Sequence, residues 1–217
     1  MPGFKVFDID NYHALCNTLA AQDPDLNHVL MKYGYPPFWS RANTFESLVH
    51  IILEQQVSLA SALAALNKLK AKIGEIDPVA FLRLTDEELK ACYFSRQKTV
   101  YVRDLAQKII NGELSLAILA SLSADEIRLQ LKRVKGVGDW TVDIYLLFIL
   151  HHSDIFPLGD LAAVNALKNL KNLPKDTSKE ELSAIATQWK PYRTIAVMIL
   201  WHFYLEEPKI KGAIAKC

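Results

Sequence analysis

Two glycines stand on either side of a valine in VKGVGDW, residues 134–140, in a chain that has only eight glycines among its 217 residues. Gly136 and Gly138 carry no side chain and can adopt positive φ, so a tight turn here can bring peptide N–H groups close to a bulky ligand. A helix that begins at about Asp139 would point its unpaired amides and the positive end of its dipole the same way. This combination binds phosphate, although an ordinary glycine-capped turn between two helices would explain the same glycines.

Three basic residues next to this turn supply local positive charge in a chain whose formal net charge is only +1: Lys132, Arg133 and Lys135. A nearly neutral chain is not expected to coat nucleic acid, but it can contact a few phosphates at one place. The segment therefore predicts a local phosphate contact.

Asp160 stands directly before LAAVNAL, which has the pattern of a starting helix, so its carboxylate is a candidate either for an N-cap or for chemistry. The pattern alone favours an ordinary N-cap aspartate. Asp154 is the nearby competitor, in the loop that follows His152. His151 and His152 are adjacent and have no third ligand at metal spacing, so we expect them in a solvated loop rather than in a metal site.

Helical periodicity dominates the chain, and no run of strict alternation predicts a sheet, so the expected fold class is all-α with about ten helices. The expected helix starts are Thr44, Ser58, Asp77 before Pro78, Ser95 and Pro191, together with the capping-box pairs Thr85 with Glu88, Ser123 with Glu126, and Ser178 with Glu181.

The spacing of apolar residues predicts which faces of these helices are buried. In the helix from Ser58 to Gly74 we expect Leu59, Leu63, Leu66 and Ile73 to point inward. The two helices around the turn have the expected inward residues Ile127, Leu131 and Val134 before it, and Ile144, Leu147 and Phe148 after it. The last helix should run from Pro191 through Tyr204, and KIKGAIAKC, residues 209–217, should be a frayed tail.

Composition excludes several classes of protein. Half of the residues are hydrophobic, enough for the core of one large domain or of two small lobes around a cleft. The chain shows neither a leader with a small-residue cleavage site nor an apolar run of about 18 residues, so we expect a soluble intracellular protein without membrane contact. Cys16, Cys92 and Cys217 are not spaced like a zinc site, so we expect reduced, structural thiols and no cofactor.

The segment LKRVKGVGDWTVDIYLLF resembles the helix-hairpin-helix of the DNA glycosylase superfamily that includes endonuclease III and the bacterial alkyladenine (3-methyladenine type II) glycosylases. Three other segments match in the same order along the chain: ILEQQVS at 52–58, FPLGDLAAV at 156–164 and WKPYRTIAVMILW at 189–201. The last of these is similar to the alkyladenine branch in particular. The extra N-terminal domain of some members of that branch does not fit into residues 1–43.

The resemblance implies a monofunctional DNA glycosylase of base excision repair that hydrolyses the N-glycosidic bond of alkylated purines flipped out of duplex DNA. It places the catalytic aspartate at Asp160, where a carboxylate stabilises the positive sugar of the transition state and can also orient water. Bifunctional members have a lysine at the position of Trp140. An indole cannot form the covalent imine, so no strand cleavage is expected.

The resemblance also implies a base pocket around Trp140 and Trp201, whose rings could stack on a cationic alkylated purine, with Ile144 and Tyr145 beside them. Trp39 and Trp189 are then expected to be packing residues. Related enzymes can carry an aromatic residue where this chain has Ile144, which leaves the range of substrates open.

The DNA contacts implied by the resemblance lie in two places. Gln56 matches the wedge that fills the gap left by the flipped base, with Gln55 assisting, while Lys135, Gly136, Val137, Gly138 and Thr141 belong to the hairpin. The carbonyls of Lys132, Val134 and Val137 match positions that hold a monovalent cation, Na⁺ or K⁺. Lys190 and Arg193 are equally suited to DNA or to a plain helix surface.

The implied architecture is a helical lobe of residues 44–152 that ends in the hairpin, and a second lobe formed by residues 1–43 and 153–217, with Asp160 in a cleft between them. Damaged double-stranded DNA is the expected partner, without an obligate protein partner, and the protein is expected to be a monomer. The expected location is cytoplasmic, at the nucleoid in a bacterium, or nuclear in a eukaryote. Two alternatives stay open: a glycosylase for deaminated or oxidised bases, and a non-catalytic helix-hairpin-helix module.

Overall fold

The computed structural model describes residues 6–207, which form helices joined by loops. Within that range the only extended pairing is a single antiparallel bridge between Val6 and His152. The all-α fold class is therefore confirmed. None of the described helices is both long enough and apolar enough to cross a membrane.

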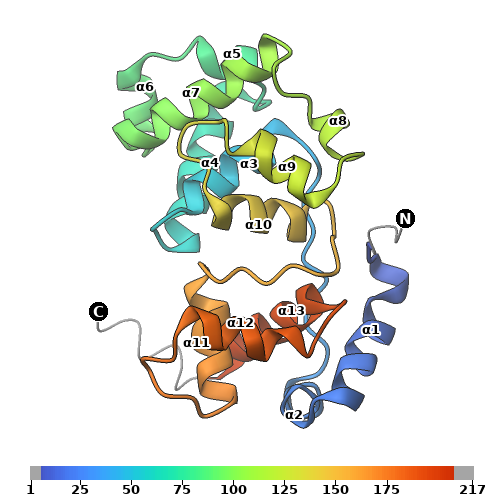
Figure 1. The fold of residues 1–217 in the computed structure, drawn as a ribbon. Coiled ribbons are helices and arrows are strands. Elements are labelled where there is room, and N and C mark those ends of the chain that lie inside the picture. The colour runs from blue at the N-terminus through green and yellow to red at the C-terminus, as the bar shows by residue number, and fades with distance from the viewer. Residues whose placement is uncertain (1–5, 208–217) are drawn as a thin grey trace. The chain divides into compact units, whose positions relative to one another are not determined.

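Thirteen helices are present among the described residues (Figure 1). They are α1 (Ile9–Gln22), α2 (Pro24–Tyr33), α3 (Phe45–Glu54), α4 (Leu59–Ile73), α5 (Pro78–Leu82), α6 (Asp86–Ala91), α7 (Arg96–Ile110), α8 (Leu116–Leu119), α9 (Ala124–Leu131), α10 (Asp139–Phe148), α11 (Leu161–Leu170), α12 (Lys179–Thr187) and α13 (Arg193–Glu206). The expected number of about ten was too low because α1, α2 and α8 were not anticipated. Each of them begins at a side-chain cap, supplied by Asp8, Asp23 and Ser115.

The helices form two compact units. The middle unit comprises residues 41–145, and the terminal unit comprises, among the described residues, 6–40 and 146–207. The expected boundaries were 44 and 152, so the last residues of α10 and the loop through His152 belong to the terminal unit rather than to the middle one.

The terminal unit is built around α13. Every residue of this helix from Thr194 to Phe203 is buried, and α1, α2 and α11 pack against it. A helix that is apolar on all sides is stable only when neighbours cover it all round, which explains its central place. It begins at Arg193 and not at Pro191, which lies in the turn before the helix, so the expected start was wrong.

The middle unit has α3 in its core, packed against α4 and α7, while α5 and α6 pack on α7. Thr44 caps α3, whose buried residues include Leu48, Val49, Ile52 and Leu53, as the apolar spacing predicts.

The expected inward face of α4 was partly wrong. Leu59 and Leu63 are 65% and 48% exposed, and the residues that α4 buries are Ala62, Ala65, Leu66 and Leu69. The inner face of α4 thus combines two alanines with two leucines, and the buried stripe is rotated away from Leu59 and Leu63. The expected frayed tail, residues 209–217, lies outside the described residues.

Candidate functional site

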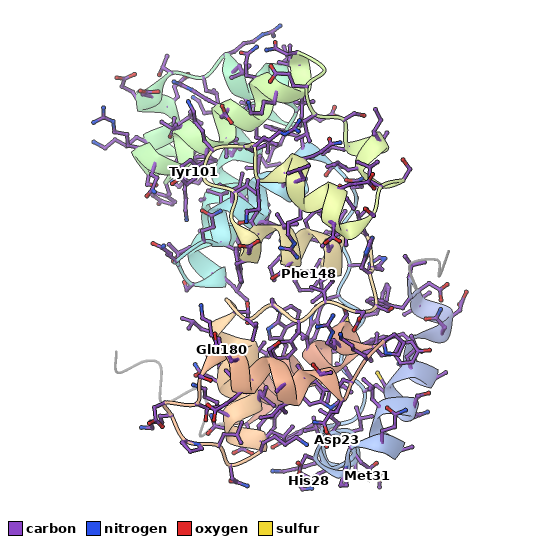
Figure 2. The ribbon with its side chains drawn as sticks, in the orientation of Figure 1. Asp23, His28, Met31, Tyr101, Phe148 and Glu180 are labelled. Carbon is purple, nitrogen blue, oxygen red and sulfur yellow. The ribbon has the colours of Figure 1, made fainter. Side chains whose placement is uncertain are left out.

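The hairpin between α9 and α10 has the conformation that its glycines predict at one of the two positions. Gly136 has φ +75°, and a Cβ atom added there would overlap the ring of Tyr101. Tyr101 projects from α7 (Figure 2). Only glycine fits this place, because the backbone is left-handed and an aromatic ring covers it. Gly138 does not have positive φ, and nothing lies within 4 Å of its added Cβ, so the positive φ that is open to both glycines is adopted only at Gly136.

Two amides of the hairpin loop are already bonded inside the protein. The Lys135 N–H donates to the Asp104 carboxylate at 2.9 Å, and the Val137 N–H donates to the Val134 carbonyl at 3.1 Å. The N–H groups of Gly136 and Gly138 donate no hydrogen bond to another group within the described residues. These two amides and the first turn of α10 are what the loop can present to an anion.

Basic residues near the hairpin are divided between two roles. Arg128 donates to Asp139 at 3.1 Å and to Asp143 at 2.6 Å, while the Lys132 amine lies 3.0 Å from Asp139. These ion pairs tie α9 to the first turn of α10, and the Lys132 contact, followed by that of Arg128, lowers the pKa of Asp139. The Lys132 amine is therefore paired with a carboxylate of the protein itself.

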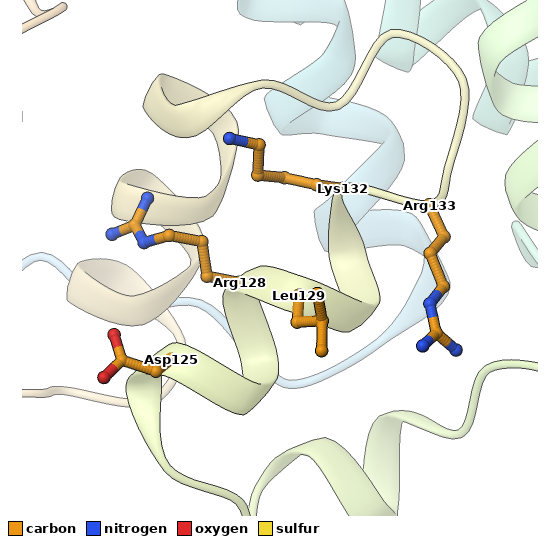
Figure 3. A pocket seen from close by; sticks show the side chains of 5 residues that line it. All are labelled: Asp125, Arg128, Leu129, Lys132 and Arg133. Atoms are coloured by element: carbon orange, nitrogen blue, oxygen red, sulfur yellow. The ribbon is translucent and has the colours of Figure 1, made fainter.

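Figure 3 shows a surface hollow on α9 lined by Asp125, Arg128, Leu129, Lys132 and Arg133. The Arg128 and Lys132 side chains extend toward the same side in this view, and Arg133 points away from them. Lys132, Arg133 and Lys135 are all exposed, but Arg133 and Lys135 make no ion pair within the described residues, so these two leave their charge available to a ligand.

The expected wedge segment follows α3 directly. Gln55 caps the C-terminus of α3, and its carboxamide nitrogen donates to the Gly136 carbonyl at 3.0 Å and to the Thr141 hydroxyl at 2.9 Å. Gln56 is exposed and has φ +57°. Thr141 is only 2% exposed, so its hydroxyl bonds to Gln55 inside the middle unit and does not face solvent.

Asp160 in the terminal unit is the N-cap of α11. Its Oδ1 atom accepts the Ala163 N–H at 2.8 Å and the Trp201 indole N–H at 3.0 Å. Two donors from different helices therefore orient a half-buried carboxylate. The competing Asp154 is held by Arg193 through bonds of 2.6 and 3.1 Å, which gives both residues a structural role.

Aromatic rings surround the Trp201 side of this carboxylate. The Phe148 ring stacks on Trp201 with centroids 5.1 Å apart and planes 12° from parallel, and the Trp39 ring meets Trp201 edge-on at 6.3 Å. Trp39 was expected only to pack and Phe148 only to line a helix interface. Neither had a local signal in the sequence, because both contacts join segments that are far apart in the chain. Trp189 is fully buried and donates to Asp23 at 2.8 Å, as expected of a packing residue.

The other expected pocket residues lie on α10. Trp140 is half-buried in the first turn. Ile144 is 2% exposed and Tyr145 is fully buried, with its hydroxyl donating to Asn43 at 2.9 Å. Burial also raises the pKa of Tyr145. The structure thus places Ile144 and Tyr145 in the core, which differs from the expected position at a pocket wall.

The histidine pair is not in a solvated loop, so that expectation was wrong. His152 is 8% exposed and His151 is half-buried against the rings of Phe7 and Phe38. Burial lowers the pKa of both imidazoles. Across residues 6–207 no cluster of three or more histidine, cysteine, aspartate or glutamate side chains is placed to hold a metal ion.

A family model described as HhH-GPD superfamily base excision DNA repair protein matches residues 49–191 of the chain. DNA-3-methyladenine glycosylase 1 of Schizosaccharomyces pombe is 31% identical over 161 residues, which cover 72% of this chain and 71% of that protein. The Bacillus subtilis protein YfjP is 27% identical over 81% of this chain, and the match spans only 64% of its own length.

Solved structures give the same result for the fold. The S. pombe 3-methyladenine DNA glycosylase in complex with abasic DNA has a TM-score of 0.80 and 28% identity, with 87% of this chain and 95% of that chain covered. A DNA-3-methyladenine glycosidase from Bacillus halodurans has a TM-score of 0.74 and 28% identity, with 98% and 94% covered.

Proposed function

Because the chain belongs to the HhH-GPD superfamily of base excision DNA repair proteins, we propose that it is a monofunctional glycosylase acting on alkylated purines in duplex DNA. The proposed reaction is hydrolysis of the N-glycosidic bond of a 3-methyladenine-type base. Several relatives are named as 3-methyladenine glycosylases, and one of the similar structures contains abasic DNA, the product of such a reaction.

The observation that carries this proposal is the geometry of Asp160. Cleavage of the N-glycosidic bond leaves positive charge on the sugar, and a carboxylate that is already oriented stabilises this charge as it develops. The Ala163 amide and the Trp201 indole fix Oδ1 of Asp160 before substrate arrives. Asp160 is thus the proposed catalytic residue, and it also serves to orient the attacking water.

The aromatic rings around Trp201 suit the expected leaving group. An alkylated purine carries positive charge on its ring, so it gains from stacking on an indole and from cation–π attraction. Trp201 and Trp140 are the aromatic residues that we propose stack on the base. This stacking offsets part of the cost of taking the nucleotide out of the duplex.

The hairpin is the proposed contact with the DNA backbone. The Gly136 and Gly138 amides, the first turn of α10 and the exposed Lys135 would bind phosphate without reading the bases. A monovalent cation bound to the carbonyls of Lys132, Val134 and Val137 remains part of this proposal, and the Val134 carbonyl also accepts the Val137 N–H. Exchange of K⁺ for a tetraalkylammonium ion at constant ionic strength should weaken duplex binding if the cation is bound.

Absence of strand cleavage is proposed from Trp140, because an indole has no amine to form an imine with the sugar. The experiment is incubation of the protein with duplexes that contain methylated purines, uracil or 8-oxoguanine, in the presence and absence of borohydride. We expect release of free methyladenine, an intact strand and no trapped complex. Release of uracil or 8-oxoguanine alone would overturn the assigned substrate class, and a trapped complex would overturn the monofunctional mechanism.

A further inference from the structure

Gln55 connects the turn that carries Gln56 to the hairpin. Its carboxamide nitrogen has two N–H groups, and both are used: one bonds the Gly136 carbonyl at 3.0 Å and the other bonds the Thr141 hydroxyl at 2.9 Å. One acceptor lies in the hairpin loop and the other in the first turn of α10. Gln55 therefore spans the loop and the helix that follows it.

The residue after Gln55 has an unusual backbone. Gln56 has φ +57°, a left-handed conformation that is rare for residues with a side chain and that persists only where its surroundings impose it. The same turn leaves the Gln56 side chain exposed. The direction in which Gln56 points thus depends on how firmly Gln55 is held.

The hairpin loop does not depend on Gln55 alone. Asp104 on α7 accepts the Lys135 N–H at 2.9 Å, and the Tyr101 ring of the same helix covers Gly136. Breaking the Gln55 bonds should therefore loosen the Gln56 turn while the phosphate-binding loop keeps its shape.

From these contacts we infer that Gln55 is a positioning residue, which fixes the gap-filling Gln56 at a set distance from the phosphate-binding hairpin and does not itself enter the DNA. This inference rests on the proposed function and on the resemblance that matches Gln56 to the wedge position, because it takes Gln56 as the group that enters the gap. A group that must fill a gap one nucleotide wide needs a fixed offset from the point where the backbone is gripped, since misplacement of about 1 Å removes most of the benefit.

The test compares two duplexes of the same sequence, one intact and one with a tetrahydrofuran abasic-site analogue. In Gln55→Met, which keeps the length of the side chain but cannot donate, the preference for the abasic duplex should fall about tenfold, the effect of losing two neutral hydrogen bonds. Binding to the intact duplex should change less than about twofold, since phosphate contacts carry it. Thr141→Val removes one acceptor and should give a smaller loss of the same kind.

Two further variants separate positioning from general stabilisation. In a Gln56→Ala background, Gln55→Met should cause no additional loss of preference, because the group that it positions is already gone. Gln107→Met, which removes a carboxamide that bonds only the neighbouring Asn111 on the exposed face of α7, is the matched control and should leave both affinities unchanged.

Additive losses in the double variant, or an equal loss on both duplexes, would overturn the positioning role, and so would an unchanged preference in Gln55→Met. The proposed activity is read separately, as base release. A protein that releases no base but shows the predicted changes in preference would refute the activity and support this inference.

Discussion

A single oxygen atom, Oδ1 of Asp160, accepts two hydrogen bonds. One comes from a backbone N–H in the first turn of α11, and the other comes from the indole N–H of Trp201. The hydrogen bond from the backbone amide is the one that an N-cap residue ordinarily accepts. The hydrogen bond from the indole comes from a different helix and has no role in capping. Trp201 therefore holds the carboxylate in one orientation, while its own ring is only 9% exposed and stacks on Phe148.

Replacement of Trp201 by phenylalanine keeps an aromatic ring and removes the N–H donor. We expect kcat to fall about tenfold or more, since a hydrogen bond to a charged group is worth roughly 1.5–3 kcal/mol, while KM changes little. Single-turnover base release measures this effect. Trp189→Phe is the control, because it removes the same kind of indole bond, to Asp23, and should lower stability without changing kcat. Equal kcat values for Trp201→Phe and the native protein would contradict the role of the indole.

The candidate site could be predicted from the sequence only where its residues lie in recognisable segments. Asp160 and Trp201 lie in such segments, and the structure joins them directly. Trp39 and Phe148 gave no signal because a ring contact between distant segments leaves no periodicity in the sequence. Gln55 was expected at the DNA gap, and its contacts with the hairpin depend on tertiary placement that the sequence does not encode locally.

At the scale of elements, the hairpin depends on one of its two glycines for its conformation. Gly136 is left-handed and lies under the Tyr101 ring, whereas Gly138 has ordinary backbone and open space around it. A methyl group added at Gly136 should therefore lower the free energy of unfolding more than one added at Gly138.

Gly136→Ala should destabilise the protein by about 2–4 kcal/mol, the sum of a left-handed alanine and of overpacking against the ring. Gly138→Ala should change the free energy of unfolding by no more than about 0.5 kcal/mol. Urea unfolding of both variants measures the difference. Similar losses in both would show that the ring contact does not restrict the loop.

Helix starts were the best-predicted elements because a cap is a local signal. All three capping boxes are present, at Thr85, Ser123 and Ser178. The buried face of α4 was predicted less well, since the choice between its leucines and its alanines depends on how closely α3 approaches. The helices α1 and α2 begin at the aspartate caps Asp8 and Asp23, the latter followed by Pro24, which are local signals of the same kind.

At the scale of the whole molecule, the formal charge of +1 is counted with neutral histidines, and the titration of some of these histidines is coupled to folding. Burial lowers the pKa of His50 in the middle unit and of His151 and His152 in the terminal unit, below the ordinary value of 6.5. Between the lowered pKa values of the folded state and the ordinary pKa of 6.5, the unfolded chain binds more protons than the folded one. The contribution of these histidines to the free energy of unfolding is therefore fully present above pH 6.5 and is lost as the pH falls.

The midpoint of urea unfolding should accordingly decrease between pH 7.5 and pH 5.5. The midpoint of the His152→Gln variant should decrease less over this interval, because the substitution removes one of the imidazoles that take up a proton on unfolding. The exposed His28 provides the control, and His28→Gln should follow the native protein. A midpoint that is constant or rises toward pH 5.5 would contradict the assignment.

The most direct measurement of the central claim is base release by Asp160→Asn from methylated duplex DNA. Asparagine caps a helix about as well as aspartate, so the variant should fold normally and bind duplex within about twofold of the native protein. Without the negative charge opposite the developing sugar cation, methyladenine release should fall by about a hundredfold or more. Unchanged release by the folded variant would show that Asp160 is only the N-cap of α11.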